Sequence, residues 1–326
     1  MSAGASVFVE SPARLHFGVL DLRGSLGRRF GGLGAAIPSP SLLVEVARSP
    51  SGVAAEGPDA ERAAEFARRF LDHHGLSGGA RVVVHRPIPA HSGLGSGTQL
   101  GLAVARALAE LHRLPTEATG LALAVSRGRR SAIGTWAFAL GGFIVEGGRR
   151  PGDEGVAPLI GRYQLPPGWR CVVAIPPGNP GLSGEAEAAA FAQLPPPPER
   201  EVERVSHLVL MQLLPALVQG DIGSFGSALS EIQRITGAWF APQQGGVFAP
   251  GPGAALIRQL SSWGAAGVGQ SSWGPAVYGL VDGAGAGAAL AARCRDFLGG
   301  NGVVFEGGFA RSGARIGYGG PPSGND

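Results

Sequence analysis

The chain has 326 residues and no lysine, so all 27 of its basic side chains other than histidine are arginines. The phosphate loop of P-loop nucleotide-binding proteins requires a lysine, and its absence excludes that class. Any long cationic contact to a phosphate or a carboxylate must therefore come from arginine, whose planar guanidinium forms bidentate pairs.

Cysteine, aromatic residues and net charge are scarce as well. Cys171 and Cys294 lack metal-ligand spacing and lie in apolar segments, so we expect buried, reduced thiols. Aromatic residues make up 7% of the chain and the formal net charge is +3, with no long basic run, which argues against a nucleic-acid partner. The sequence shows no bilayer-length apolar run and no signal-peptide core, so we expect a cytoplasmic protein with no membrane partner.

Hydrophobic residues make up 44% of the chain, which is typical of a packed globular protein. Apolar periodicity predicts helices over 59–75, 97–113, 117–128, 200–219, 221–238, 252–265 and 285–299. It predicts strands over 6–22 (interrupted by a turn at Pro12), 42–48, 79–91, 141–148, 169–176, 302–309 and 313–318. A composition shift at 149–168 predicts two α+β domains, 1–165 and 166–326, with the active site in the cleft between them.

The segment PAHSGLGSGTQL (89–100) has the composition of a phosphate-binding loop. Glycines let the backbone approach an anion closely, hydroxyl side chains donate hydrogen bonds, and the following helix points its positive end at the loop. Such a loop suits a diphosphate with its magnesium ion. The alternative is an ordinary strand–turn–helix junction. The residues in question are Ser92, Gly93, Gly95, Ser96, Gly97 and Thr98.

A second segment, SPARLHFGVLDLRGSLGRRFGGLGAAI (11–37), gathers charged residues among glycines: Arg14, His16, Asp21, Arg28 and Arg29. The two neighbouring arginines can clamp a carboxylate or a phosphate. Asp21 can stabilise a cation, bind magnesium or accept a proton. The alternative is a surface hairpin with solvated charges, and a structural role is the simpler interpretation of His16.

Two further segments carry polar groups. GVGQSSWGPAVYGLV (267–281) places amide and hydroxyl donors beside an indole, which suits a polar ring or a phosphate; the alternative is a turn with a core tryptophan. RGRRSAIGTWAFALGGF (127–143) offers three arginines, or else the solvated end of a helix. The residues are Gln270, Ser271, Ser272, Trp273, Arg127, Arg129 and Arg130.

Taken together, these segments resemble β-ribofuranosylaminobenzene 5'-phosphate synthase, a non-kinase branch of the GHMP kinase superfamily. The matching stretches are RLHFGVLDLRGSLGRRFGGLG, SGLGSGTQLGLAVA, RGRRSAIG, GGFIVEGG, GLSGEAEAAAF and GQSSWGP, in this order from residue 11 to about 281. The resemblance implies the two-domain α+β fold of that superfamily. It also implies a homodimer.

The resemblance further implies a decarboxylating C-phosphoribosyltransferase. Phosphoribosyl pyrophosphate is the expected donor, and 4-aminobenzoate or a heteroaromatic acid such as an aminopyrazole carboxylate is the expected acceptor. The products are a C-riboside 5'-phosphate, CO2 and pyrophosphate. Such enzymes serve methanopterin-type cofactor synthesis or C-nucleoside antibiotic synthesis.

The resemblance assigns expected roles to individual residues. We expect Asp21 and Arg28 to act in catalysis, the first near the developing cation and the second as an anion clamp. We expect Mg2+ at Ser96 and Glu185. The expected substrate-binding residues are Arg14, His16, Arg29, Ser92, Gly93, Gly95, Ser96, Gly97, Thr98, Arg130, Gln270, Ser271, Ser272 and Trp273.

The segment 127–143 departs from the pattern of these synthases in its bulky Trp136 and Leu140. If this segment shapes the acceptor pocket, the acceptor differs from 4-aminobenzoate.

Two alternatives stay open. An ATP-dependent GHMP small-molecule kinase would carry an aspartate base after the phosphate-loop helix, where this chain has SRGRRSAIGTWAF with no carboxylate. A non-catalytic nucleotide- or RNA-binding module would need a basic face with stacking aromatics.

Overall fold

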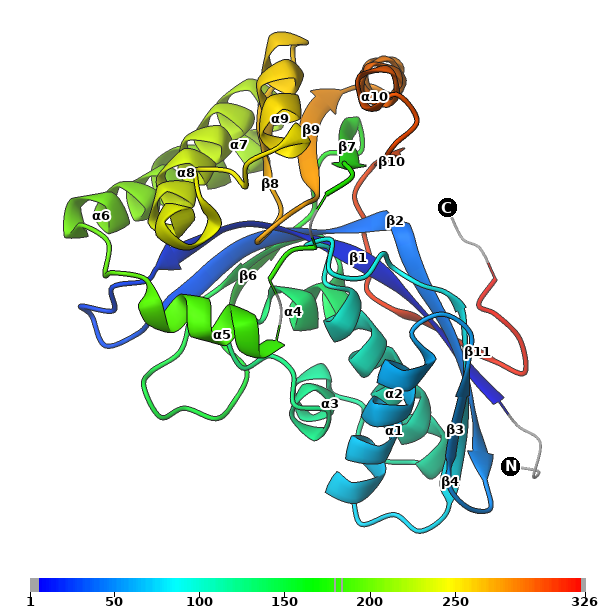
Figure 1. Ribbon diagram of the computed structural model, residues 1–326. Coiled ribbons are helices and arrows are strands. Elements are labelled where there is room, and N and C mark those ends of the chain that lie inside the picture. Colours follow the sequence, from blue (N-terminus) through cyan, green and yellow to red (C-terminus); the bar gives the residue numbers. More distant parts are fainter. Residues whose placement is uncertain (1–5, 179, 183, 324–326) are drawn as a thin grey trace.

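A computed structural model describes residues 6–178, 180–182 and 184–323. It contains two β-sheets, one of seven strands and one of four (Figure 1). In the first sheet the strand order is β11-β1-β2-β4-β3, and β5 and β6 extend it from β2. The second sheet has the order β10-β7-β9-β8. The mixture of sheets and helices confirms the predicted α+β class.

The strands of the first sheet are β1 (Ser6–Asp21), β2 (Phe30–Ser49), β3 (Val53–Glu56), β4 (Gly79–Arg86), β5 (Phe143–Glu146), β6 (Leu159–Tyr163) and β11 (Arg315–Tyr318). Those of the second are β7 (Trp169–Ile175), β8 (Gly267–Gln270), β9 (Val277–Asp282) and β10 (Val303–Gly307). The predicted domain boundary at 165/166 falls between β6 and β7. The end of the chain departs from that division, because β11 pairs with β1.

Helices cover each sheet. Those packed on the first sheet are α1 (Ala60–His73), α2 (Ser96–His112) and α4 (Ile133–Leu140), and α3 (Ala118–Ala124) packs against these three helices. The others are α5 (Gly184–Gln193), α6 (Glu199–Leu208), the π-helical turn η1 (Val209–Leu213), α7 (Leu214–Gln219), α8 (Ile222–Gln244), α9 (Pro252–Ser262) and α10 (Ala284–Leu298). Helix α8 contacts both β8 and β1, so it joins the two halves (Figure 1).

The first two strands are longer than the sequence predicts. The turn expected at Pro12 is wrong, since β1 runs unbroken from Ser6 to Asp21 with irregularities of register after Pro12 and around Phe17. Bulges of this kind accommodate a proline within a strand and bend it. Likewise the Gly31–Gly34 segment belongs to β2 rather than to a turn. One hairpin of two long strands therefore underlies both halves.

The core is continuous across the halves. Buried residues of β1, α2 and α8, among them Phe17, Leu102 and Phe225, belong to one hydrophobic cluster. Phe17 contacts Tyr278 of β9 with ring centroids 5.1 Å apart. A shared core fixes the two halves relative to each other and gives the surface between them a defined shape.

Candidate active site

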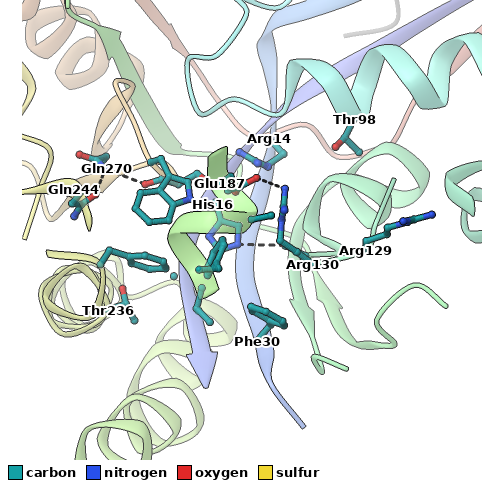
Figure 2. Close-up of a pocket in the computed structure, with 18 of the residues that line it drawn as sticks. Arg14, His16, Phe30, Thr98, Arg129, Arg130, Glu187, Thr236, Gln244 and Gln270 are labelled. Atoms are coloured by element: carbon teal, nitrogen blue, oxygen red, sulfur yellow. Dashed lines mark hydrogen bonds and ion pairs between the residues drawn. The ribbon is translucent and has the colours of Figure 1, made fainter. Parts of the chain in front are cut away.

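A cavity of about 640 Å3 lies where the β1–β2 hairpin, α5, α8 and the segment before α4 meet (Figure 2). Volumes of this size accommodate small-molecule substrates. Predicted site residues that line it are Arg14, His16, Thr98, Arg130, Glu185, Gln270, Ser272 and Trp273. It therefore draws on both predicted domains.

The glycine-rich segment connects β4 to α2 and is held by the loop that follows β8. The Ser271 hydroxyl donates to the Gly93 carbonyl over 2.7 Å, and the Ala276 amide donates to the Ser92 carbonyl over 3.0 Å. Gly93 has a φ of +81°, and a Cβ there would lie 2.2 Å from the Ser271 carbonyl oxygen, so no other residue fits.

The hydroxyls of this loop differ from expectation in their use. The Ser92 hydroxyl donates to the Pro89 carbonyl over 2.7 Å, so its hydrogen is used within the loop and not for a ligand. Of the predicted loop residues, only Thr98 lines the cavity; Ser92, Gly93, Gly95, Ser96 and Gly97 do not. Helix α2 nevertheless begins at Ser96 with no side-chain cap and no acidic residue in its first turn. Its first backbone N–H groups and its positive dipole end therefore favour an anion.

Arginines supply the charge that the missing lysines cannot. Arg14 of β1 is partly buried and donates to the Gly93 carbonyl. Burial lowers the pKa of the Arg14 guanidinium to about 10, and Glu187 acts in the opposite sense. Burial also lowers the pKa of Arg127 to about 10, aided by repulsion from neighbouring arginines. Both guanidiniums remain charged at neutral pH, and a bound anion would relieve their cost of burial.

His16 lies beside Arg14 on the wall of the cavity (Figure 2). Burial, together with the charge of Arg14, lowers the pKa of the His16 imidazole to about 3, so the ring is neutral at physiological pH. Its Nε2 lies 3.4 Å from the Ser131 hydroxyl, and its backbone N–H donates to the Ser271 hydroxyl over 3.0 Å. A neutral imidazole can exchange hydrogen bonds with a substrate without repelling a cation.

Aromatic rings form the opposite part of the cavity lining. We call Phe30, Phe191, Phe240 and Trp273 the aromatic wall. Trp273 packs against Phe240 with ring centroids 4.8 Å apart and against Phe191 at 5.5 Å, both edge to face. Phe191 also meets Phe30 edge to face at 5.6 Å. Such a wall favours a flat apolar ring.

Glutamines hold the loop that carries Trp273. The Gln270 side chain donates to the Ser272 carbonyl and to Gln244, and it accepts from the Ala249 amide over 2.8 Å. Gln233 accepts from the Gln270 amide and donates to the Phe17 carbonyl over 2.7 Å. These amides are engaged with one another and with backbone, so their contribution is to position the indole.

Carboxylates reach the cavity from α5. Glu187 forms an ion pair with Arg130 at 2.5 Å, and Figure 2 shows it reaching across from α5 towards that arginine. Glu185 also lines the cavity, whereas Ser96, the other expected magnesium ligand, does not. The described residues hold no cluster of three or more acidic, histidine or cysteine side chains arranged for a metal. The residues present thus fit a magnesium ion held mainly by substrate phosphates and one carboxylate.

Asp21, Arg28 and Arg29, three of the predicted residues, lie at the end of the β1–β2 hairpin, outside the cavity lining. The Asp21 carboxylate accepts from the backbone N–H groups of Arg23 and Gly24 over 2.6 and 2.8 Å. Arg28 donates to the carbonyls that follow β5, and Arg29 donates to the Leu22 carbonyl over 3.0 Å. In this structure their polar groups shape the hairpin that ends at Phe30, and no cavity contact supports their expected roles.

The segment 127–143 reaches the cavity through residues 127–131, which come before the two bulky residues that distinguish it. Trp136 and Leu140 do not line the cavity. The Trp136 indole N–H donates to the Ala157 carbonyl over 2.9 Å, and Leu140 is exposed. Neither bulky residue touches the cavity, so the inference that they change the acceptor stays a prediction without a contact to support it.

Several lining residues escaped prediction. They include Phe30, Arg69, Ser131, Glu187, Phe191, Gln233, Thr236, Phe240 and Gln244. Arg127 and Arg129, which the sequence offered as candidates beside Arg130, also line the cavity. The phenylalanines come from three distant elements, and only the tertiary fold brings them together.

Comparisons with known proteins place this geometry in a family. The family described as GHMP kinases N terminal domain matches residues 60–142, and GHMP kinases C terminal matches residues 213–299. Among solved structures, homoserine kinase from Cytophaga hutchinsonii superposes with a TM-score of 0.73 at 17% identity, covering 97% of this chain and 98% of that one. Mevalonate kinase from L. major gives a TM-score of 0.68 at 17% identity, covering 91% and 94%. These likenesses confirm the two-domain GHMP kinase fold.

Curated relatives are more similar in sequence. A β-ribofuranosylphenol 5'-phosphate synthase from Methanothermobacter thermautotrophicus is 40% identical over 296 residues, covering 85% of this chain and 89% of that protein. A protein of the same name from Archaeoglobus fulgidus is 34% identical over 286 residues, covering 84% and 87%. The chain therefore belongs to the β-ribofuranosylphenol 5'-phosphate synthase family, on the fold of the GHMP kinases.

Proposed function

We propose that the protein transfers a phosphoribosyl group from phosphoribosyl pyrophosphate to a ring carbon of an aromatic carboxylic acid, with loss of CO2 and pyrophosphate. The observation that carries this proposal is the division of one cavity into two chemically distinct parts. Arg14, Arg127, Arg130 and the start of α2 gather positive charge at one side. The aromatic wall offers ring edges and faces at the other. A polyanionic sugar donor and a flat acceptor match these two parts.

In the proposed reaction, the bond between ribose C1 and the diphosphate oxygen breaks, and the electron pair leaves with pyrophosphate. The ring carbon bearing the carboxylate attacks C1 to form the new carbon–carbon bond. The bond to the carboxylate then breaks, CO2 departs, and its electron pair restores the aromatic ring. No proton transfer and no protein nucleophile is needed, so the arginines act by stabilising the leaving charge and the wall by orienting the ring.

We propose an acceptor with a ring hydroxyl, because the relatives are named for a ribofuranosylphenol product. An oxygen substituent donates electrons to the ring carbon that attacks. The aminobenzoate and heteroaromatic acids expected from the sequence are the competing acceptors. Magnesium, when bound through the diphosphate, would neutralise part of its charge, and Glu185, a lining carboxylate, is the residue that would hold it.

The test is release of labelled CO2 from carboxyl-labelled acids in the presence of phosphoribosyl pyrophosphate and Mg2+. We expect 4-hydroxybenzoate to give faster release than 4-aminobenzoate or an aminopyrazole carboxylate, and none without the donor. Faster turnover of another acid would change the acceptor alone. Absence of donor-dependent CO2 from every acid would overturn the reaction type.

The kinase alternative has the fold in its favour but lacks a base. Among described residues, the only carboxylates lining the cavity are Glu185 and Glu187, and the second is paired with Arg130. Both belong to α5 and not to the segment directly after the phosphate-loop helix, where a kinase of this fold would carry its aspartate. Phosphoribosyl pyrophosphate should therefore raise the melting temperature in a thermal-shift assay more than ATP does.

A further inference from the structure

Arginines from two distant segments converge over the first turn of α2. Arg62 belongs to α1, and Arg127 follows α3. A Cβ added to Gly97 would lie 2.5 Å from Arg62 Nη2 and 3.2 Å from Arg127 Nη2. The two guanidiniums thus occupy the space that a side chain at Gly97 would take, directly beside the unpaired N–H groups of the helix.

Arg127 is held in place by packing rather than by a carboxylate. Its guanidinium lies over the Phe66 ring, 4.8 Å from the centroid, in a cation–π contact. Its Nε is buried and has no hydrogen-bond partner among the described residues. Arg62, Arg69 and Arg130 are the nearest positive charges, and their repulsion adds to burial in lowering the pKa of Arg127. A buried donor without a partner is costly, so the group is prepared for an anionic ligand.

Arg62 has a carboxylate partner but remains accessible. It pairs with Asp59 at 3.1 Å, and 30% of its side chain is exposed. A partly exposed pair between residues three apart on one helix turn contributes little to stability and can exchange for a phosphate at low cost. The pair therefore orients Arg62 beside α2 without neutralising the site.

We propose that Arg62 and Arg127, with the first turn of α2, bind the terminal phosphate of the diphosphate leaving group. This inference rests on the function proposed above. The attacking ring must approach ribose C1 from the face opposite the leaving oxygen, so the diphosphate extends away from the aromatic wall. Figure 2 shows Thr98 of α2 and the amides of Gln244 and Gln270 on opposite sides of the cavity, and Gln270 donates to the carbonyl of Ser272, the residue before Trp273. The diphosphate therefore points towards α2, and its far phosphate reaches Arg62 and Arg127.

Calorimetric titration with inorganic pyrophosphate and, separately, with ribose 5-phosphate distinguishes the two anionic ends of the donor. We expect Arg62→Gln and Arg127→Gln each to weaken pyrophosphate binding by roughly 10-fold or more, the usual effect of losing a charge-assisted hydrogen bond. Ribose 5-phosphate binding should not change. Arg68→Gln is the matched control, because Arg68 lies on the same helix, is 54% exposed and pairs only with Glu65.

Two additional variants separate the loss of a phosphate contact from a general effect on folding. Arg127→Lys keeps the charge above Phe66 and should retain more pyrophosphate affinity than Arg127→Gln. Gly97→Ala places a methyl group between the guanidiniums and should weaken binding with Arg62 and Arg127 both present. If Arg127→Gln melts early, Arg62→Gln alone carries the test, since its side chain is on the helix surface.

The remaining outcomes are distinct. Pyrophosphate affinity equal to that of Arg68→Gln in both glutamine variants overturns the subsite but leaves the reaction standing. Loss of ribose 5-phosphate binding in place of pyrophosphate binding assigns the arginines to the other phosphate and also overturns it. A wild-type protein that binds neither pyrophosphate nor the donor removes the proposed function and this inference together.

Discussion

At the scale of single residues, the site combines groups that are each costly to bury alone. Arg14 is a partly buried cation, and His16 beside it is a buried imidazole kept neutral by a lowered pKa. Hydrogen bonds offset only part of the desolvation cost. Arg14 donates to the Gly93 carbonyl, and the His16 ring lies within reach of the Ser131 hydroxyl. This unfavourable balance is typical of a site that has been arranged for a charged ligand.

His16 should make stability depend on pH in the acid range. Its pKa in the folded state is about 3, below the 6.5 expected in the unfolded chain. Between these two pH values His16 is protonated in the unfolded chain but neutral in the folded protein. The free energy of unfolding therefore decreases as pH falls from 6.5 towards 3. Between pH 7 and 4.5 the loss from this group is about 2.5 kcal/mol.

The measurement is urea unfolding of wild type and His16→Gln across that range. Glutamine keeps a polar side chain without a titrating ring, so the variant should have a shallower slope of unfolding free energy against pH. Identical slopes would show that the imidazole is protonated in the folded protein or that it is accessible to water.

At the scale of elements, the β1–β2 hairpin links the sequence prediction to the site. Arg28 donates to the Gly147 carbonyl over 2.9 Å, next to Glu146, whose buried carboxylate accepts from the Gly148 amide over 2.7 Å. Asp21 closes the hairpin turn. The same ten-residue stretch ends at Phe30 of the aromatic wall. The predicted residues are therefore near the site in sequence but act on its framework in this structure.

The catalytic role expected for Asp21 stays a prediction, and Asp21→Asn tests it cleanly. Asparagine retains an oxygen for the Arg23 and Gly24 N–H groups, so the turn and the melting temperature should persist while the negative charge disappears. If the charge stabilises the developing cation, kcat should fall about tenfold or more. Wild-type kcat in steady-state assays would leave Asp21 as a turn-forming residue alone.

Elements with strong periodicity were predictable from the sequence. The prediction of a helix over 59–75 is confirmed by α1, and those over 97–113 and 285–299 by α2 and α10. Helix α4 was missed because its eight residues are apolar on nearly every side and lack capping signals. The aromatic wall could not be predicted, because it depends on how α5 and α8 pack across β2 and no local pattern records that packing.

At the scale of the whole molecule, the last strand of the structure, β11, lies beside the first, β1. Strand β11 pairs antiparallel with β1 over Val7–Glu10, and the Gly319 amide donates to the Ser6 carbonyl over 3.0 Å. Arg315 also forms an ion pair with Glu10 at 2.5 Å. The first sheet, which holds Arg14 and His16, is thus completed by residues more than 300 positions away.

Ending the chain after residue 312 should expose this edge of β1. Unpaired strand edges recruit other chains, so we expect a lower melting temperature and aggregation on heating, measured by light scattering. Arg315→Ala in the full chain is the control, since it removes one ion pair but keeps the strand. A truncated protein that scatters no more light than wild type on heating and melts at the same temperature would show that β11 contributes nothing to the sheet.

The position of β11 also sets an order of events on the ribosome. Strand β1 is synthesised about 300 residues before β11, the strand that pairs with its edge. Val7–Glu10 therefore have one edge unpaired until β11 has been made. During this interval the edge is open to pairing with other chains, and β11 removes that hazard once it joins the sheet.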